Sequence, residues 1–327
     1  MSTFVKARPA LYTVLPLLIV LVLGAIFNAN GAFFHWSTQR AMLREISVLG
    51  TLACGMTLVV VAGGIDLAVG SVLSLSAVSF ALLTLHWGWS GWMAIVLVAV
   101  LGLLSGIASG SLVALARMPA FIGTLAMMVF ARGLAKQLSG GQKISNYRPN
   151  AQGQFENLPV PAIFDSLDAR VLGGQISVVT LVFAASVALT WLVLERLRVG
   201  RYLFGVGGNE EAARLSGVPV RFTYLVAYGL SGLFAAIAGI CQAAQETQGD
   251  PETGIGYELD AIAMVVLGGT RLSGGRGGVG RTVIGALTLG YLQKILSLNA
   301  FTTEARLMLT GLILVLALIL QRRLDRP

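Results

Sequence analysis

Long stretches without a charged side chain are the feature that most restricts how this chain can fold. The longest extends from Leu67 to Ala116 and contains no Asp, Glu, Lys or Arg. Shorter uncharged runs cover residues 9–39, 46–65, 171–194 and 222–245. A helix needs about 20 apolar residues to cross the hydrocarbon core of a bilayer. The chain therefore contains several segments that are long enough to span a membrane.

The composition agrees with this interpretation. Charged residues make up 12% of the 327 residues and hydrophobic residues make up 56%, whereas a soluble chain carries about 25% charged residues. These values exclude a disordered chain, a disulfide scaffold and an ordinary cytosolic enzyme. Open sheets and exposed loops cannot span lipid, because every backbone N–H and C=O group must be paired inside the protein. We therefore predict an all-α, polytopic membrane protein with a single domain, residues 1–327.

We expect about ten transmembrane helices, some of them short or broken. The run from Leu67 to Ala116 is too long for one helix. A cluster rich in Trp and Gly at residues 86–92 is suited to the lipid–water interface and divides the run in two. The helices are expected near 10–27, 46–62, 67–85, 92–115, 119–138, 177–195, 222–244, 257–270, 282–298 and 305–321.

The distribution of Lys and Arg predicts the orientation. If both termini are cytoplasmic, most of the 23 basic residues fall in inner segments, as the positive-inside rule requires. The acidic segment 245–260 has no basic residue and fits an outer position. A periplasmic loop is then expected at 139–176 and a cytoplasmic loop at 196–221. We attribute the net charge of +8 to this topology and expect no nucleic-acid partner.

Two sequence strings suggest nucleotide binding, but their context is wrong. Residues 138–142 read LSGGQ, a signature of ABC ATPases, yet the chain contains no Gly-Lys pair for a phosphate-binding loop. Residues 275–280 satisfy G-x-G-x-x-G, yet no acidic residue follows at the required distance. The two histidines, His35 and His86, have no catalytic or metal-binding partners in the sequence. We therefore expect no catalytic residue, no metal and no cofactor.

A polar motif separates two of the apolar runs. Residues 63–71 read GGIDLAVGS and place Asp66 between helix-breaking glycines. An aspartate inside a membrane is costly and usually has a role. Asp66 can cap the next helix by accepting its free N–H groups, or it can line a polar path through a broken helix. These two interpretations are compatible, and the sequence leaves both open.

A second motif predicts a short helix in the cytoplasmic loop. Asn209 is a good N-cap. Glu210 and Glu211 fall in the first turn, where the helix dipole favours negative charge. The following residues are strong helix formers, and Gly217 is placed to end the helix. An ordinary surface helix would show the same local pattern.

This motif also carries a family resemblance. Glu211, Ala212, Ala213 and Gly217 match the E-A-A-x-x-x-G pattern of ABC importer permeases. The stretches GGIDLAVGS at 63–71, PAFIGTL at 119–125 and GYELDAIAMVVLGGTRLSGGRGG at 256–278 are similar to those of ribose-type sugar permeases. The chain thus resembles the ribose-type monosaccharide ABC permeases from about residue 49 to 320, in motifs that occur in the expected order.

The resemblance implies a multi-pass protein of the bacterial inner membrane that translocates a monosaccharide. A cytoplasmic ABC ATPase would drive it, a periplasmic sugar-binding protein would deliver the sugar, and a second permease copy or paralogue would complete the pathway in the lipid. The acidic segment 246–260 and the loop 139–176 are natural docking faces for the delivery protein. The surface that couples to the ATPase would comprise Asn209, Glu210, Glu211, Ala212, Ala213, Arg214 and Gly217.

Candidates for the translocation pathway are less specific, because each also has a purely structural explanation. Phe121 can face lipid, Thr124 can bond its own helix backbone, and Arg132 can anchor at the interface. The candidates are Asp66, Ser71, Phe121, Thr124, Arg132 and Glu246.

Two other classes of protein stay open at this point. One is an ion-coupled secondary transporter, for which Asp66 and Lys294 are the available intramembrane charges. The other is a membrane-embedded enzyme, which the missing catalytic cluster disfavours. A short internal repeat, 60–67 against 265–272, suggests a duplication.

Overall fold

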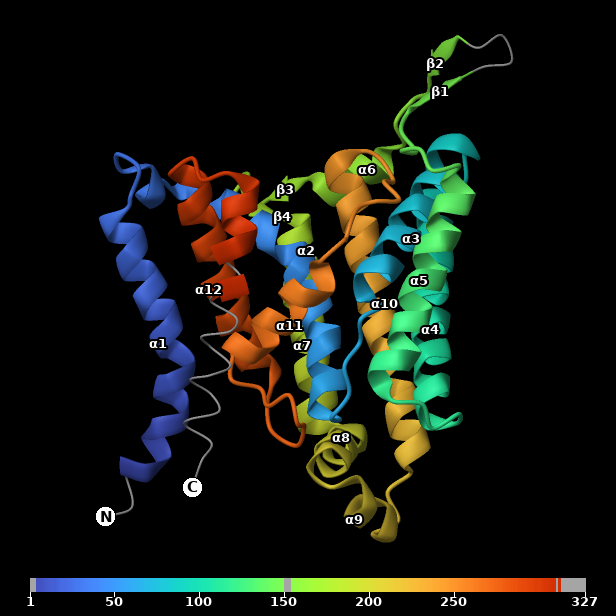
Figure 1. Cartoon of the computed structure of the whole chain (residues 1–327). Helices are drawn as coiled ribbons and strands as arrows, with labels where there is room; N and C mark the ends of the chain where they lie inside the picture. Colours follow the sequence, from blue (N-terminus) through green and yellow to red (C-terminus); the bar gives the residue numbers. More distant parts are fainter. Residues whose placement is uncertain (1–3, 150–153, 310, 313–327) are drawn as a thin grey trace.

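The computed structural model describes residues 4–149, 154–309 and 311–312, and its helices run side by side in a bundle (Figure 1). Within these residues, five helical segments are long and apolar enough to cross a membrane. They confirm that the chain is an all-α membrane protein. The five segments are Trp36–Val61, Val69–His86, Gly91–Ala114, Val178–Arg196 and Val220–Glu246.

Most helices follow the predicted segments to within a few residues, but the first two begin at Phe4 and Trp36, six and ten residues before the segments expected at 10–27 and 46–62. Two helices end in a π-helical turn, η2 (Leu82–His86) and η3 (Leu192–Arg196). Residues 303–309 are helical, but most of the helix expected at 305–321 lies outside the described residues. The long helices are α1 (Phe4–Ile26), α2 (Trp36–Val61), α3 (Val69–Ala81), α4 (Gly91–Ala114), α5 (Ala120–Ser139), α7 (Val178–Trp191), α10 (Val220–Glu246), α11 (Tyr257–Leu267) and α12 (Val279–Leu298).

Helix α10 lies at the centre and packs against α2, α3 and α4. In the spans of α2 and α3, 89% of the residues are buried, whereas in those of α4 and α7 only 33% are. Helices α4 and α7 therefore present apolar side chains outward. Small residues let the helices approach closely. A Cβ atom on Gly106 of α4 would lie 2.1 Å from the carbonyl oxygen of Tyr228 in α10. Close backbone packing therefore holds the core together.

Two segments enter the bundle without helical structure. Residues 62–68 join α2 to α3, and residues 247–256 join α10 to α11, so that α3 and α11 begin part-way along the bundle (Figure 1). The segment before α11 meets the first turn of α3, because a Cβ on Gly70 would lie 2.2 Å from the carbonyl oxygen of Gly254. Broken helices of this kind are tolerated in membranes where protein surrounds the exposed backbone.

The ends of α2 and α11 have the same geometry, which recurs at the ends of α5 and α10 and is therefore not specific to the internal repeat. Gly63 has φ +82° and Gly269 has φ +83°. The next residue in each case, Gly64 or Thr270, donates its N–H to the carbonyl five residues earlier, as in a Schellman cap. Gly63 therefore corresponds to Gly269, one residue later than the sequence alignment of 60–67 with 265–272 suggests.

The loops expected outside and inside lie at opposite ends of the bundle (Figure 1). One end carries a protruding antiparallel hairpin, in which β1 (Tyr147–Pro149) pairs with β2 (Phe155–Asn157). Helix α6 (Ala162–Asp168) and the small pair β3 (Arg170–Val171) with β4 (Ile176–Ser177) lie at the same end. The other end carries α8 (Arg198–Gly208) and α9 (Glu210–Leu215). A 3₁₀ turn, η1 (Ala32–Phe34), precedes α2.

Candidate functional site

Helix α9 forms where the sequence predicts a short helix. The side-chain oxygen Oδ1 of Asn209 accepts a hydrogen bond from the N–H of Ala212 at 2.9 Å, which is the predicted N-cap. Gly217 lies just beyond the helix with φ +81°, a conformation that glycine adopts without strain. The local signals for the beginning and the end of this helix are both confirmed.

The exposed face of α9 carries a fixed pair of charges. Nε of Arg214 donates to Oε2 of Glu211 at 2.9 Å, and both side chains are more than half exposed. This hydrogen bond lowers the pKa of the Glu211 carboxyl and raises the pKa of the Arg214 guanidinium. Ala213 faces the other way and is buried. Helix α9 therefore presents an ordered, charged surface at the end of the bundle.

Two neighbours hold α9 in place. Glu210 accepts a hydrogen bond from the hydroxyl of Tyr224, in the first turns of α10, at 3.0 Å. On its other side, Asn209 is the only residue between α8 and α9, and its N–H donates to Gly205 in α8. The two short helices are thus joined almost rigidly and are linked to the central helix of the bundle.

Sequence reasoning missed α8. Leu203 and Val206 of α8 are buried against the bundle, whereas Arg198 and Arg201 are exposed. This spacing is that of an amphipathic helix, and it was the available signal. Helix propensity alone does not predict α8, because four of its residues are glycine, and each glycine disfavours helix by about 1 kcal/mol.

Asp66 lies in the segment between α2 and α3 and is buried. Its Oδ1 accepts the N–H of Ala68 at 3.0 Å, just before α3 begins. Its Oδ2 accepts the hydroxyl of Ser231 in α10 at 2.7 Å. The carboxylate therefore closes a turn just before α3, whose N-cap residue is Ala68, and ties this turn to the central helix.

The carbonyl of Ile65, next to Asp66 in the α2–α3 segment, interacts with two further hydroxyl groups. It accepts hydroxyl hydrogen bonds from Tyr228 of α10 and from Thr124 of α5, both at 3.3 Å. The single hydroxyl proton of Thr124 is shared with the carbonyl of Ala120 in its own helix, which lies closer at 2.8 Å. Ser71 is buried in the first turn of α3. The structure thus brings Asp66, Ser71 and Thr124 to one region of the core.

Of the other three pathway candidates, Phe121 and Glu246 are exposed, whereas Arg132 bonds the segment that packs against the start of α3. Phe121 is 55% exposed on the outer face of α5. Arg132, also in α5, donates to the carbonyl oxygens of Pro251 and Thr253 at 2.6 and 2.7 Å. Glu246 ends α10 and accepts a hydrogen bond from Gln242 one turn earlier at 2.5 Å.

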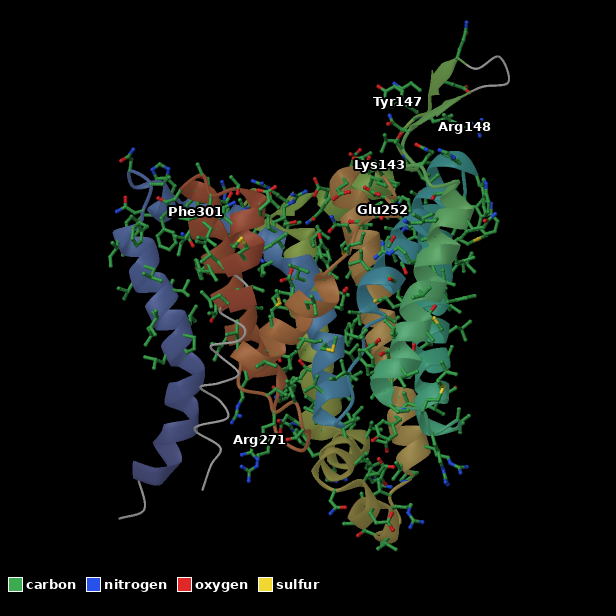
Figure 2. All side chains as sticks on the ribbon, in the orientation of Figure 1. Lys143, Tyr147, Arg148, Glu252, Arg271 and Phe301 are labelled. Atoms are coloured by element: carbon green, nitrogen blue, oxygen red, sulfur yellow. The ribbon has the colours of Figure 1, made fainter. Side chains whose placement is uncertain are left out.

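Charges mark the hairpin end of the bundle. Figure 2 shows Lys143 and Glu252 at this end and Arg271 at the opposite end. Lys143 pairs with Asp250 at 3.0 Å, and Lys136 pairs with Glu252 at 2.6 Å. The acidic segment that follows α10 is therefore partly neutralised by lysines from the end of α5 and the loop after it.

Comparison with known proteins shows which family combines these features. The family described as branched-chain amino acid transport system / permease component matches residues 40–318, which is most of the chain. The chain belongs to this permease family.

Individual relatives of the permease confirm the resemblance to ribose-type proteins. The ribose import permease protein RbsC of Escherichia coli (strain K12) is 35% identical over 314 residues, which cover 95% of this chain and 93% of the relative. RbsC of Bacillus subtilis (strain 168) is 35% identical over 315 residues, covering 94% and 91%. The L-arabinose transport system permease protein AraH of Escherichia coli (strain K12) is 35% identical over 308 residues, covering 93% and 88%.

These relatives, together with the apolar helices, confirm a multi-pass protein of the inner membrane. No solved protein structure matches the chain.

Lys294 is the second intramembrane charge that the sequence offered for an ion-coupled transporter. Its ammonium group pairs with Oε1 of Glu45 in α2 at 2.9 Å. Lys294 is in α12, whereas Asp66 is bonded to Ala68 and Ser231 elsewhere in the permease. The two charges therefore have separate partners and do not form a common site.

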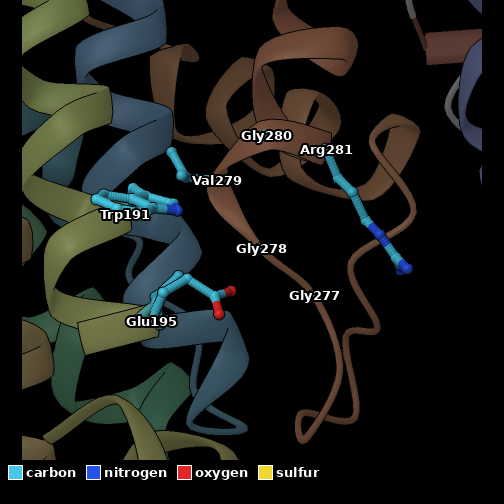
Figure 3. Close-up of a pocket in the computed structure, with 8 residues that line it drawn as sticks. Trp191, Glu195, Gly277, Gly278, Val279, Gly280 and Arg281 are labelled. Carbon is cyan, nitrogen blue, oxygen red and sulfur yellow. The ribbon is translucent and has the colours of Figure 1, made fainter. Parts of the chain in front are cut away.

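A cavity of about 390 Å³ opens beside the turn that precedes α12. Trp191 and Glu195, at the end of α7 and in η3, line one wall, and residues 277–280 line the other (Figure 3). The side chain of Arg281 points away from Glu195. Gly277 and Gly278, which precede α12, thus have open space on one side.

Proposed function

We propose that this chain is the membrane-spanning permease subunit of an ATP-driven ABC importer that translocates a monosaccharide across the inner membrane. The similarity to ribose and L-arabinose permeases over more than nine tenths of the chain supports the sugar class. The observation that carries the proposal is α9, a capped helix with exposed charges at one end of the bundle.

In this proposal a separate cytoplasmic ATPase hydrolyses ATP, and the chain itself performs no catalysis. The ATPase binds the exposed face of α9, where Glu211 and Arg214 fix the register and Ala212 permits close approach. Arg214 is held by its hydrogen bonds to Glu211, so the surface is ordered before the partner binds. The full coupling surface is Asn209, Glu210, Glu211, Ala212, Ala213, Arg214 and Gly217, in which the buried Ala213 positions the helix and does not touch the ATPase.

The remaining partners bind elsewhere on the same single domain, residues 1–327. A periplasmic sugar-binding protein docks at the opposite end, on the hairpin β1–β2 and the acidic segment 246–260. A second permease copy or paralogue completes the pathway within the lipid. We infer about ten spans with both termini cytoplasmic, which is supported by the basic residues of α8 and α9.

The residues assigned to the translocation pathway divide into two groups. Asp66, Ser71 and Thr124 are buried within one subunit, and we propose that they shape the pathway by holding the α2–α3 segment in position. Arg132 acts in the same way on the segment before α11. Phe121 and Glu246 are exposed and are the candidates for direct contact with sugar or with the second subunit.

Substitution of Glu211 by Arg tests the proposal. The variant loses the hydrogen bonds with Arg214 and places two like charges side by side on the docking face. We expect ATP hydrolysis stimulated by the sugar-loaded binding protein to fall at least about tenfold, with normal insertion into the membrane. The measurement uses the chain copurified with its ATPase in proteoliposomes.

The matched control is Glu304→Arg, which reverses an exposed carboxylate in the segment after α12, outside the surfaces proposed for either partner. It should leave the stimulated hydrolysis unchanged if only the α9 end contacts the ATPase. Sugar uptake that persists without any ATPase and stops when a proton uncoupler is added would contradict the proposal and identify an ion-coupled transporter.

A further inference from the structure

Three backbone segments that are remote in the sequence meet at the end of α8. They are the C-terminal end of α2, the last turn of α8 and the turn between α11 and α12. The N–H of Gly275 donates to the carbonyl oxygen of Val61 at 3.0 Å. Gly207 packs against both partners of this bond, since a Cβ on Gly207 would lie 1.9 Å from the Val61 oxygen and 2.6 Å from the Gly275 nitrogen.

Gly274 and Gly275 also pack directly against backbone atoms of the other two segments. A Cβ on Gly274 would lie 2.8 Å from the Cα atoms of both Gly63 and Gly207, and one on Gly275 would lie 2.7 Å from Cα of Gly208. Gly63, Gly274 and Gly275 also have positive φ angles. We call Gly63, Gly207, Gly274 and Gly275 the glycine junction. Because no side chain lies between these backbones, a shift of one segment is passed directly to the others.

The start of α8 is seated as closely as its end. A Cβ on Gly200 would lie 2.1 Å from the carbonyl oxygen of Leu194, in the π-helical turn η3. Gly200 and Gly207 are seven residues apart and so lie on the same face of α8, together with the buried Leu203. The backbone of α8 therefore contacts the bundle directly near both ends of the helix, at Gly200 and at Gly207.

The segments that the glycine junction joins lead to the break between α2 and α3 and to the turn between α11 and α12. Residue 63 is three residues before Asp66, which caps the turn before α3 and is bonded to α10. Gly275 belongs to the turn that connects α11 to α12, and the cavity of about 390 Å³ beside residues 277–280 leaves this turn room to move (Figure 3). The end of α2 and the α11–α12 turn thus meet at α8.

We propose that the glycine junction transmits movement of the α8–α9 pair to the α2–α3 segment and to the α11–α12 turn, with Gly207 as its central positioning residue. This inference rests on the proposed function, in which the ATPase moves α9. Because only Asn209 separates α9 from α8, a displacement of α9 displaces Gly207 and, with it, both backbone segments.

The test compares two adjacent alanine substitutions in α8. Gly207→Ala inserts a methyl group into the junction, whereas a Cβ on Gly208 meets no atom within 4 Å. Both changes have the same effect on intrinsic helix propensity. Each variant is reconstituted with the ATPase and the binding protein. ATP hydrolysis and uptake are measured with the sugar, from a panel of pentoses and hexoses, that the wild-type complex transports.

We expect Gly207→Ala to reduce the sugar transported per ATP about tenfold, while the ATPase still copurifies and hydrolyses ATP at nearly the wild-type rate. Gly208→Ala should transport as the wild type does. Equal transport per ATP in the two variants would overturn the inference. A wild-type complex whose uptake does not require ATP would instead overturn the proposed function, and the inference with it.

A second variant covers the case in which Gly207→Ala does not assemble. Gly63→Ala brings its Cβ to 3.5 Å from Cα of Gly207, which is an ordinary contact, and strains only its own positive φ angle. We expect this variant to assemble and to transport less sugar per ATP. A wild-type ratio of transport to hydrolysis in Gly63→Ala would then overturn the inference.

Discussion

Both carboxylate oxygens of Asp66 have a partner inside the bundle, the N–H of Ala68 and the hydroxyl of Ser231. Asp66→Ala leaves these two buried donors without an acceptor, and each unpaired group costs about 1–3 kcal/mol. We therefore expect the free energy of unfolding to fall by roughly 3 kcal/mol. Thermal unfolding of the purified chain in detergent measures this loss.

Asp66→Asn separates the capping role of Asp66 from a role of its charge in the pathway. The amide oxygen can still accept the N–H of Ala68, so the stability should fall by no more than about 1 kcal/mol. If the residue acts by capping, uptake of sugar by this variant stays near the wild-type value. A stable Asp66→Asn protein without uptake would show that the negative charge itself is required.

At the scale of elements, the segment before α11 depends on donors from its neighbours. Its carbonyl groups at Pro251 and Thr253 accept hydrogen bonds from Arg132, and Pro251 also accepts one from Ser74. Such bonds to a charged donor contribute about 1.5–3 kcal/mol. In Arg132→Ala, the segment before α11 should therefore detach from α5 more often.

The measurement is labelling of a single cysteine at position 253, after Cys54 and Cys241 have been replaced by alanine. We expect the rate of reaction with a membrane-impermeant maleimide to rise at least about tenfold in Arg132→Ala. Arg148→Ala is the control, because Arg148 lies in the exposed hairpin at 4.0 Å from Glu156. Equal labelling in both variants would show that Arg132 does not hold the segment.

The elements that local signals define were predictable, and those that tertiary contacts define were not. Helix α9 has its cap at Asn209 and its stop at Gly217, and both were found in the sequence. Helix α8 has an amphipathic spacing, but four of its residues are glycines that disfavour helix. Gly200 and Gly207 fit closely against other backbones, which no local pattern encodes. The acidic segment after α10 looked like a simple outer loop, but Gly254 packs against Gly70 in the core.

The whole molecule has two chemically different ends. The end with α8 and α9 is rich in arginine, whereas the hairpin end carries the acidic segment and the lysines that partly neutralise it. Because cytoplasmic loops of membrane proteins are enriched in Lys and Arg, we predict that α9 faces the cytoplasm. ATP is available on that side, so the coupling role of α9 depends on this orientation.

Single cysteines at Leu215 and Tyr147, in the cysteine-free background, test the orientation. These side chains are 76% and 56% exposed and lie at opposite ends of the bundle. In intact cells with a permeable outer membrane, an impermeant maleimide should label only position 147. In inverted inner-membrane vesicles it should label only position 215, and detergent should expose both. If positions 147 and 215 were both labelled from the same side of the membrane, the chain could not cross it an odd number of times between them. The reverse pattern would place α9 in the periplasm, where no cytoplasmic ATPase could reach it.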